Sequence, residues 1–161
     1  MMRNRASRPT SANAPYQGVQ GTGCSRHGEA AACLTRDLRL GGLRLVPSSE
    51  LVARVIADVP SGRVITLSQL IGCLTQRFGG DRVGVRALHA ALRDLESKAV
   101  AALEHELEPA VPVWRLLANN LTVDPHSALN PLFAATRLRA EGHCLTRDHG
   151  RWKVCDPGPL H

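Results

Sequence analysis

Four basic side chains recur every three or four residues between positions 82 and 93. They are Arg82, Arg86, His89 and Arg93, and offsets of four, three and four place such residues in one stripe along an α-helix. Arginine carries a planar set of donors that fits phosphate oxygens and the edges of bases. The stripe therefore predicts contact with a nucleic acid, and the alternative is an ordinary solvated helix face.

The same segment has the features of a helix that approaches a groove. Ala87 and Ala90 lie beside the stripe, and small side chains let a helix backbone come close to DNA. We predict a helix over residues 81–96, whose apolar side would pack on a core. The apolar positions are Val85, Leu88, Leu92 and Leu95.

A second helix is predicted directly N-terminal to the basic helix. Thr66 and Gln69 have the spacing of a capping box, so a helix should start at Leu67 and run to a turn at Gly79 and Gly80. Two helices joined through a glycine turn, the second of them basic, are typical of a helix-turn-helix. Thr66 and Ser68, at the start of the earlier helix, are expected to add contacts to DNA.

The remaining pattern completes a small fold. Apolar spacing predicts a helix over 49–59 and another over 132–141, with Gly142 as its C-terminal cap. Residues 99–107 can continue as helix, residues 111–117 are predicted to form a short buried element, and residues 118–130 are predicted to form a loop. Residues 144–154 read as a hairpin around His149 and Gly150. We therefore predict a mainly α fold, a winged helix-turn-helix with a small C-terminal β-hairpin.

Length and composition indicate one domain. The chain has 161 residues, and we assign 1–45 to a flexible N-terminal arm and 46–161 to the domain. The net charge of +6 suits a nucleic-acid partner, although a GC-rich genome also enriches arginine. Aromatic residues are only 3% of the chain, which disfavours a stacking platform for single strands. No membrane span or signal peptide is expected, so we predict a cytoplasmic protein that associates with the nucleoid when bound.

The five cysteines are widely spaced and odd in number, which favours free thiols. Cys24, His27 and Cys33 lack a defined fourth ligand for zinc. We predict no metal site and no cofactor.

Three segments in order resemble the C-terminal, DNA-binding domain of the alkylguanine-DNA alkyltransferases and their alkyltransferase-like relatives. Residues 59–70 (VPSGRVITLSQL) look like the family's opening, and residues 86–93 (RALHAALR) are similar to its recognition helix. The third segment, residues 112–117 (PVWRLL), stands where the family has its acceptor cysteine, and it is followed by residues 137–142 (RLRAEG), which are similar to the family's ending.

This resemblance implies a mode of binding. The predicted recognition helix would enter the minor groove, and Arg86 would fill the stack after a damaged guanine rotates out. The flipped base would enter a pocket whose walls are implied by the same resemblance. The implied pocket residues are Leu67, Pro112, Val113, Trp114, Arg115 and Glu141.

The departures from the family decide the chemistry. Val113 stands in the place of the acceptor cysteine and Trp114 in the place of the activating histidine, while Glu141 corresponds to the glutamate. An aliphatic side chain cannot accept an alkyl group, so we predict no enzyme activity. Leu67 replaces a tyrosine of the family, the asparagine expected after Arg93 is missing, and residues 119–130 differ from the family's lid.

The basic stripe and the resemblance together imply a non-enzymatic, alkyltransferase-like protein that binds duplex DNA through the minor groove by nucleotide flipping, whether or not the duplex carries alkyl damage. The resemblance implies that it would mark alkylated guanine for nucleotide excision repair proteins. One alternative is a winged-helix binding or regulatory module without lesion preference. Another is a residual enzyme that uses a different thiol, such as Cys73.

Overall fold

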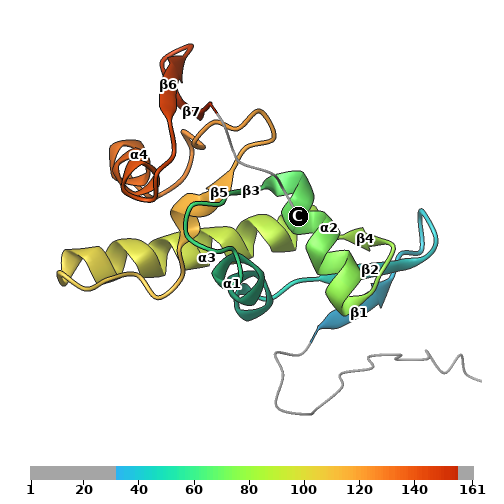
Figure 1. Cartoon of the computed structure of the whole chain (residues 1–161). Helices are drawn as coiled ribbons and strands as arrows, with labels where there is room; N and C mark the ends of the chain where they lie inside the picture. Colours follow the sequence, from blue (N-terminus) through green and yellow to red (C-terminus); the bar gives the residue numbers. More distant parts are fainter. Residues whose placement is uncertain (1–31, 156–161) are drawn as a thin grey trace, which may run out of the picture.

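The computed structural model describes residues 32–155, which form four helices and several small sheets (Figure 1). The architecture is mixed α/β rather than mainly α, because short strands pair between the helices as well as at the C-terminal end. In chain order the elements are β1 (Cys33–Arg36), β2 (Leu43–Val46), α1 (Ser49–Ala57), β3 (Ile65–Thr66), α2 (Leu67–Phe78), β4 (Arg82–Val83), α3 (Val85–Glu104), the 3-10 helix η1 (Val113–Arg115), β5 (Leu116–Leu117), α4 (Pro131–Ala140), β6 (Leu145–Asp148) and β7 (Arg151–Val154).

The first two helices begin where the sequence predicts. Ser48 caps α1, and its hydroxyl accepts from the backbone N–H of Leu51. At α2 the capping box is confirmed: the Gln69 side chain accepts from the N–H of Thr66 at 2.8 Å, and Thr66 Oγ1 accepts from the N–H of Gln69 at 3.4 Å.

Helix α3 differs from its prediction at both ends. It begins at Val85 rather than Asp81, because Arg82 and Val83 form strand β4, which pairs in parallel with β2. It continues to Glu104, eight residues past Glu96 and into the segment 99–107 whose pattern also allows a helix. Val85 was predicted to be buried but is 60% exposed, since the buried side starts at Leu88 and continues through Ala91, Leu95 and Ala99.

The N-terminal strands occupy part of the predicted arm. β1 and β2 pair antiparallel, with Cys33 opposite Val46 and Arg36 opposite Leu43, so residues 33–45 are ordered structure and not part of an arm. The rest of the predicted arm, residues 1–31, lies outside the described residues.

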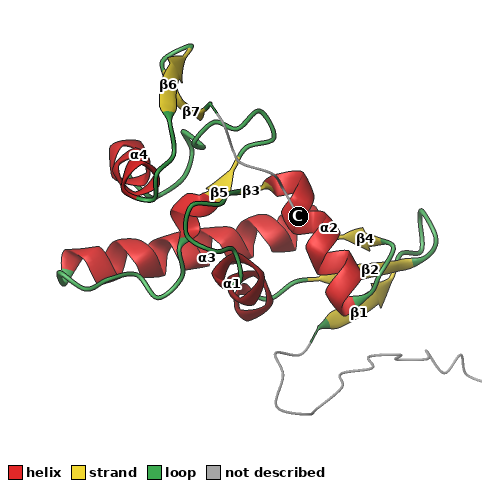
Figure 2. Ribbon diagram, in the orientation of Figure 1, coloured by secondary structure: helices red, strands yellow, loops and turns green. Residues whose placement is uncertain are grey.

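The core forms where α1 packs against α2 and α3 (Figure 2). Strand β3 pairs in parallel with β5, with Ile65 opposite Leu116 and Thr66 opposite Leu117. This pairing brings the start of α2 beside the segment around Val113. The fully buried leucines of the core are Leu45, Leu51, Leu70, Leu74, Leu88, Leu117 and Leu138.

The C-terminal elements agree with the sequence prediction. Helix α4 ends before Gly142, whose φ of 92° is the left-handed conformation expected of a capping glycine. The predicted hairpin is confirmed as β6 and β7, and its turn places His149 and Gly150 at positive φ. None of the helices within residues 32–155 combines the length and the apolar character that a membrane span requires.

Candidate nucleic-acid interface

The predicted basic stripe is present along most of its length. Arg86, His89 and Arg93 are exposed on α3, with Ala90 exposed between them and Ala87 half-buried. Arg82 belongs to β4 instead of the helix, and its guanidinium lies 3.5 Å from the carbonyl oxygen of Leu40. The stripe is therefore a helical row of three side chains, extended by one arginine from the neighbouring strand.

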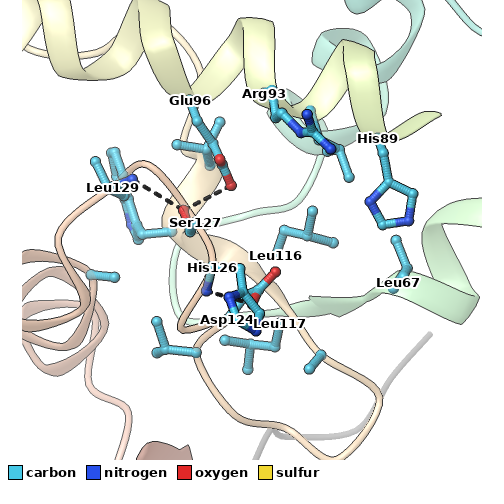
Figure 3. Close-up of a pocket in the computed structure, with 16 residues that line it drawn as sticks. Leu67, His89, Arg93, Glu96, Leu116, Leu117, Asp124, His126, Ser127 and Leu129 are labelled. Carbon is cyan, nitrogen blue, oxygen red and sulfur yellow. Dashed lines mark hydrogen bonds between the residues drawn. The ribbon is translucent and has the colours of Figure 1, made fainter. Parts of the chain in front are cut away.

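A cleft of about 360 Å³ opens beside this row (Figure 3). It lies between α3 and the segment that runs from η1 through the following loop. Residues from both predicted groups, the basic stripe and the implied pocket, line this cleft. The lining consists of Leu67, His89, Leu92, Arg93, Glu96, Val113, Trp114, Leu116, Leu117, Ala118, Val123, Asp124, His126, Ser127, Leu129 and Ala134.

One wall of the cleft is the edge of α3 that carries His89, Arg93 and Glu96 (Figure 3). Glu96 also holds the opposite loop in place: its carboxylate accepts from Ser127 Oγ at 2.7 Å and from the N–H of Ala128 at 3.0 Å. The Ser127 hydroxyl accepts in turn from the N–H of Leu129 at 3.1 Å. The loop is thus tied across the cleft to the basic helix.

The opposite side of the cleft is largely apolar. Val113 and Trp114 contribute from η1 and are only 7% and 6% exposed, while Leu116 contributes from β5. Leu67, the first residue of α2, also lines the cleft, because the β3–β5 pairing places the start of α2 beside η1 and β5. Asp124 and His126 supply polar groups at the loop, where Asp124 accepts from the N–H of His126 at 2.9 Å.

Behind the cleft, three residues of the implied pocket form a hydrogen-bonded cluster. Trp114 Nε1 donates to Glu141 at 2.8 Å, and Arg115 donates to the same carboxylate from Nε at 2.9 Å and from Nη2 at 2.8 Å. Arg115 Nη1 also donates to the carbonyl of Val59 at 2.6 Å. Arg115 and Glu141 are 14% and 11% exposed, so this is a largely buried ion pair whose carboxylate also accepts from the indole N–H of Trp114.

The environment of Glu141 keeps it charged. Burial acts to raise its pKa, but the hydrogen bonds from Arg115 and Trp114 outweigh burial and leave the pKa below the ordinary value. Neither Arg115 nor Glu141 lines the cleft, and the same holds for Pro112. The three implied pocket residues therefore lie outside the cavity itself.

The two polar residues at the start of α2 have different roles. Thr66 is buried, and both its hydroxyl and its N–H are bonded to Gln69. Ser68 is exposed, with its N–H donating to Asn119 at 2.9 Å. Ser68 can therefore present its hydroxyl to a partner, whereas Thr66 acts as a helix cap.

The thiols lie away from the cleft. Of the cysteines within residues 32–155, Cys33, Cys73, Cys144 and Cys155 are all free, and none lines the cavity. A hydrogen bond with Cys155 raises the pKa of the Cys144 thiol, which makes it a weaker nucleophile. In this described part no group of histidine, cysteine and acidic residues is arranged to hold a metal. Cys24 and His27 lie outside it.

Sequence reasoning missed the loop side of the site. Glu96, Asp124, His126 and Ser127 line the cleft but were not among the predicted residues. Glu96 could have been found, because it follows His89 and Arg93 at offsets of seven and three on the same helix face. The three loop residues carry no periodic pattern, and only the folded chain brings them to α3.

A comparison with known protein families, curated proteins and solved structures finds no match for this chain. The chemistry of the site therefore rests on the residues described above.

Proposed function

We propose that this chain is a non-enzymatic protein that binds duplex DNA in the manner of a winged helix-turn-helix, with α3 in the minor groove and a flipped base in the cleft. The observation that carries the proposal is that His89 and Arg93 belong both to the exposed basic row of α3 and to the lining of the cleft. A nucleotide rotated out of a duplex that α3 contacts would meet this opening directly.

The row on α3 has the chemistry that such a helix needs. Arg86 lies near the N-terminal end of the helix and is exposed, with the small side chains of Ala87 and Ala90 beside it. A guanidinium on a long stem can stack in the space that a base leaves and donate to the unpaired partner base. The small neighbours allow the helix backbone to approach the groove.

The cleft has a size and lining that suit a base. Its volume lies in the range of about 300–1,000 Å³ that is usual for ligand sites. Leu67, Val113 and Trp114 supply apolar contact, while Asp124 and His126 supply polar groups for base edges. Val113 has no nucleophilic atom, so a base held here would keep its alkyl group. Alkylated guanine is the lesion we propose.

One observation favours the second candidate, a DNA-binding module without lesion preference. Val113 and Trp114 are almost fully covered, and Glu96 ties the loop across the cleft. Little of the surface of Val113 and Trp114 is therefore available for contact with a base. In this second candidate, α3 would bind the duplex while the base stays stacked.

The experiment is a titration of two fluorescent duplexes that are identical except for one methylated guanine. The variant is Arg86→Ala, and its control is Lys98→Ala, which removes a charge from an exposed residue further along the same helix. We expect wild type and the control to bind the methylated duplex more tightly, and Arg86→Ala to lose that preference. Equal affinity of wild type for both duplexes would select the second candidate. Absence of binding to either duplex at moderate salt would refute the proposal.

A further inference from the structure

The N-terminal hairpin, residues 33–46, displays apolar side chains at its tip. Leu38 is 92% exposed and Leu40 is 69% exposed, and Leu43 at the start of β2 is 45% exposed. Three large apolar side chains that are exposed within six residues make this loop a candidate contact surface. Nothing in the proposed role of α3 uses them.

The tip is held in shape by one buried carboxylate. Asp37 is only 5% exposed, and its side chain accepts from the N–H groups of Arg39 and Leu40 at 3.0 and 3.1 Å. It also accepts from Arg44 at 2.7 Å, and its own N–H donates to the carbonyl of Gly42 at 3.0 Å. These bonds are local to the loop and leave Leu38 and Leu40 in solvent. The loop conformation that exposes Leu38 and Leu40 is therefore fixed before any partner binds.

The hairpin is joined directly to the start of α3. Asp81 accepts from the N–H of Leu43 at 2.8 Å, and the N–H of Gly84 donates to the carbonyl of Leu45 at 2.7 Å. Gly84 is the N-terminal cap of α3, and a Cβ placed on it would lie 3.5 Å from Cδ of Arg44. The side chain of Arg44 thus lies close to Gly84, which is two residues before Arg86.

The charge of the hairpin matches that of the proposed interface. It carries three arginines, Arg36, Arg39 and Arg44, and all three are exposed, whereas its single acidic residue, Asp37, is buried and bonded to Arg44. Arg82 of β4 lies next to the tip through its contact with the Leu40 carbonyl. Arg44 and Arg82 therefore lie between the start of α3 and the tip, together with the exposed carboxylate of Asp81.

We infer that the N-terminal hairpin is a second wing, which contacts the same duplex as α3. This inference rests on the proposed function. Arg36 and Arg39 contact phosphates, and Leu38 and Leu40 press on the groove or between two base pairs, as apolar wedges of minor-groove proteins do. In Figure 1 the loop between β1 and β2 extends past β4, away from α4 and the β6–β7 hairpin. Contacts from this loop would therefore extend the contacted stretch of DNA beyond the N-terminal end of α3.

DNA fits this surface better than an apolar protein partner or a second copy of the chain does. The exposed leucines are few and alternate with arginine, since Arg39 lies between Leu38 and Leu40. A purely apolar interface would have to cover these cations, whereas a duplex supplies phosphates for them next to a groove.

The test compares two variants of the full chain on an undamaged duplex. Arg39→Gln should lower the slope of log affinity against log salt by about one unit, as expected for one lost phosphate contact. The double variant Leu38→Ser with Leu40→Ser should weaken binding by roughly tenfold at unchanged slope, because apolar burial is lost. Its control is Leu132→Ser, at a residue on α4 that is 58% exposed. All substituted side chains are exposed, and circular dichroism verifies that each variant is folded.

A footprint of the complex supplies a second readout. Hydroxyl-radical protection should shorten at one edge of the site in the double variant and stay unchanged in Leu132→Ser. The inference is overturned if wild type binds but the hairpin variants keep its affinity, salt slope and footprint. It is equally overturned if the leucines instead hold a dimer that the double variant dissociates without loss of DNA binding. Failure of wild type to bind DNA would remove the proposed function and this inference together.

Discussion

The indole Nε1 of Trp114 donates a 2.8 Å hydrogen bond to the carboxylate of Glu141. Trp114 lines the cleft, whereas Glu141 lies behind it and is paired with Arg115. The tryptophan is therefore held by a residue that is not part of the cleft lining. The orientation of this cleft wall depends on a largely buried ion pair, and both its stability and its pH dependence can be measured.

Substitution of Glu141 should destabilise the fold strongly. In Glu141→Ala the guanidinium of Arg115, which is 14% exposed, loses its counter-charge, and we expect a loss of about 3 kcal/mol in the free energy of unfolding. Urea denaturation followed by tryptophan fluorescence measures this change. The control is Glu108→Ala, because Glu108 pairs with Arg137 but is largely exposed, so its loss should have little effect. Equal effects of the two substitutions would contradict the prediction.

The same carboxylate should make stability depend on pH. The pKa of Glu141 is lower in the folded protein than its ordinary value, so the unfolded chain takes up this proton first as the pH falls. Its contribution is complete above the ordinary glutamate pKa and disappears as the pH falls through the lowered one. The difference in free energy of unfolding between wild type and Glu141→Gln should therefore narrow in acid. A difference that stays constant down to the lowest measurable pH would argue against this assignment.

Loss of Glu96 should loosen the loop across the cleft. In Glu96→Ala, the Ser127 hydroxyl and the N–H of Ala128 lose their acceptor, so we expect faster amide hydrogen exchange at Ala128 and Leu129 with little change in the rest of α3. Glu104→Ala, at the exposed end of the same helix, is the control and should leave this loop unchanged. Unaltered exchange in the Glu96 variant would show that the loop is held by other contacts.

No alkyl group should pass from DNA to this protein. Val113 offers no nucleophile, and the described thiols lie outside the cleft. After incubation with a duplex that contains methylated guanine, under reducing conditions, the intact mass of the protein should be unchanged and the DNA should keep its methyl group. A gain of one methyl group on any cysteine would favour a residual enzyme instead.

Local structure could be predicted from the sequence because its signals lie within a few residues of each other. The capping box of Thr66 and Gln69, the glycine after α4 and the turn at His149 and Gly150 all lie where the pattern predicts. The start of α3 could not be predicted this way, because Arg82 fits a helical stripe but pairs with Arg44 of β2 in a strand. In the chain, β2 and β4 are separated by α1 and α2, so no local sequence pattern predicts that they pair.

By itself, the sequence determined the basic row of Arg86, His89 and Arg93, the absence of a nucleophile at Val113, and the four helices and the C-terminal hairpin, because these depend on residue identity and on local periodicity. Only the tertiary structure decided which of these residues meet. The β3–β5 pairing and the Glu96–Ser127 hydrogen bond bring the walls of the cleft together, while the Arg115–Glu141 pair lies outside its lining. Such contacts join residues far apart in the chain, so packing and hydrogen-bond satisfaction select them.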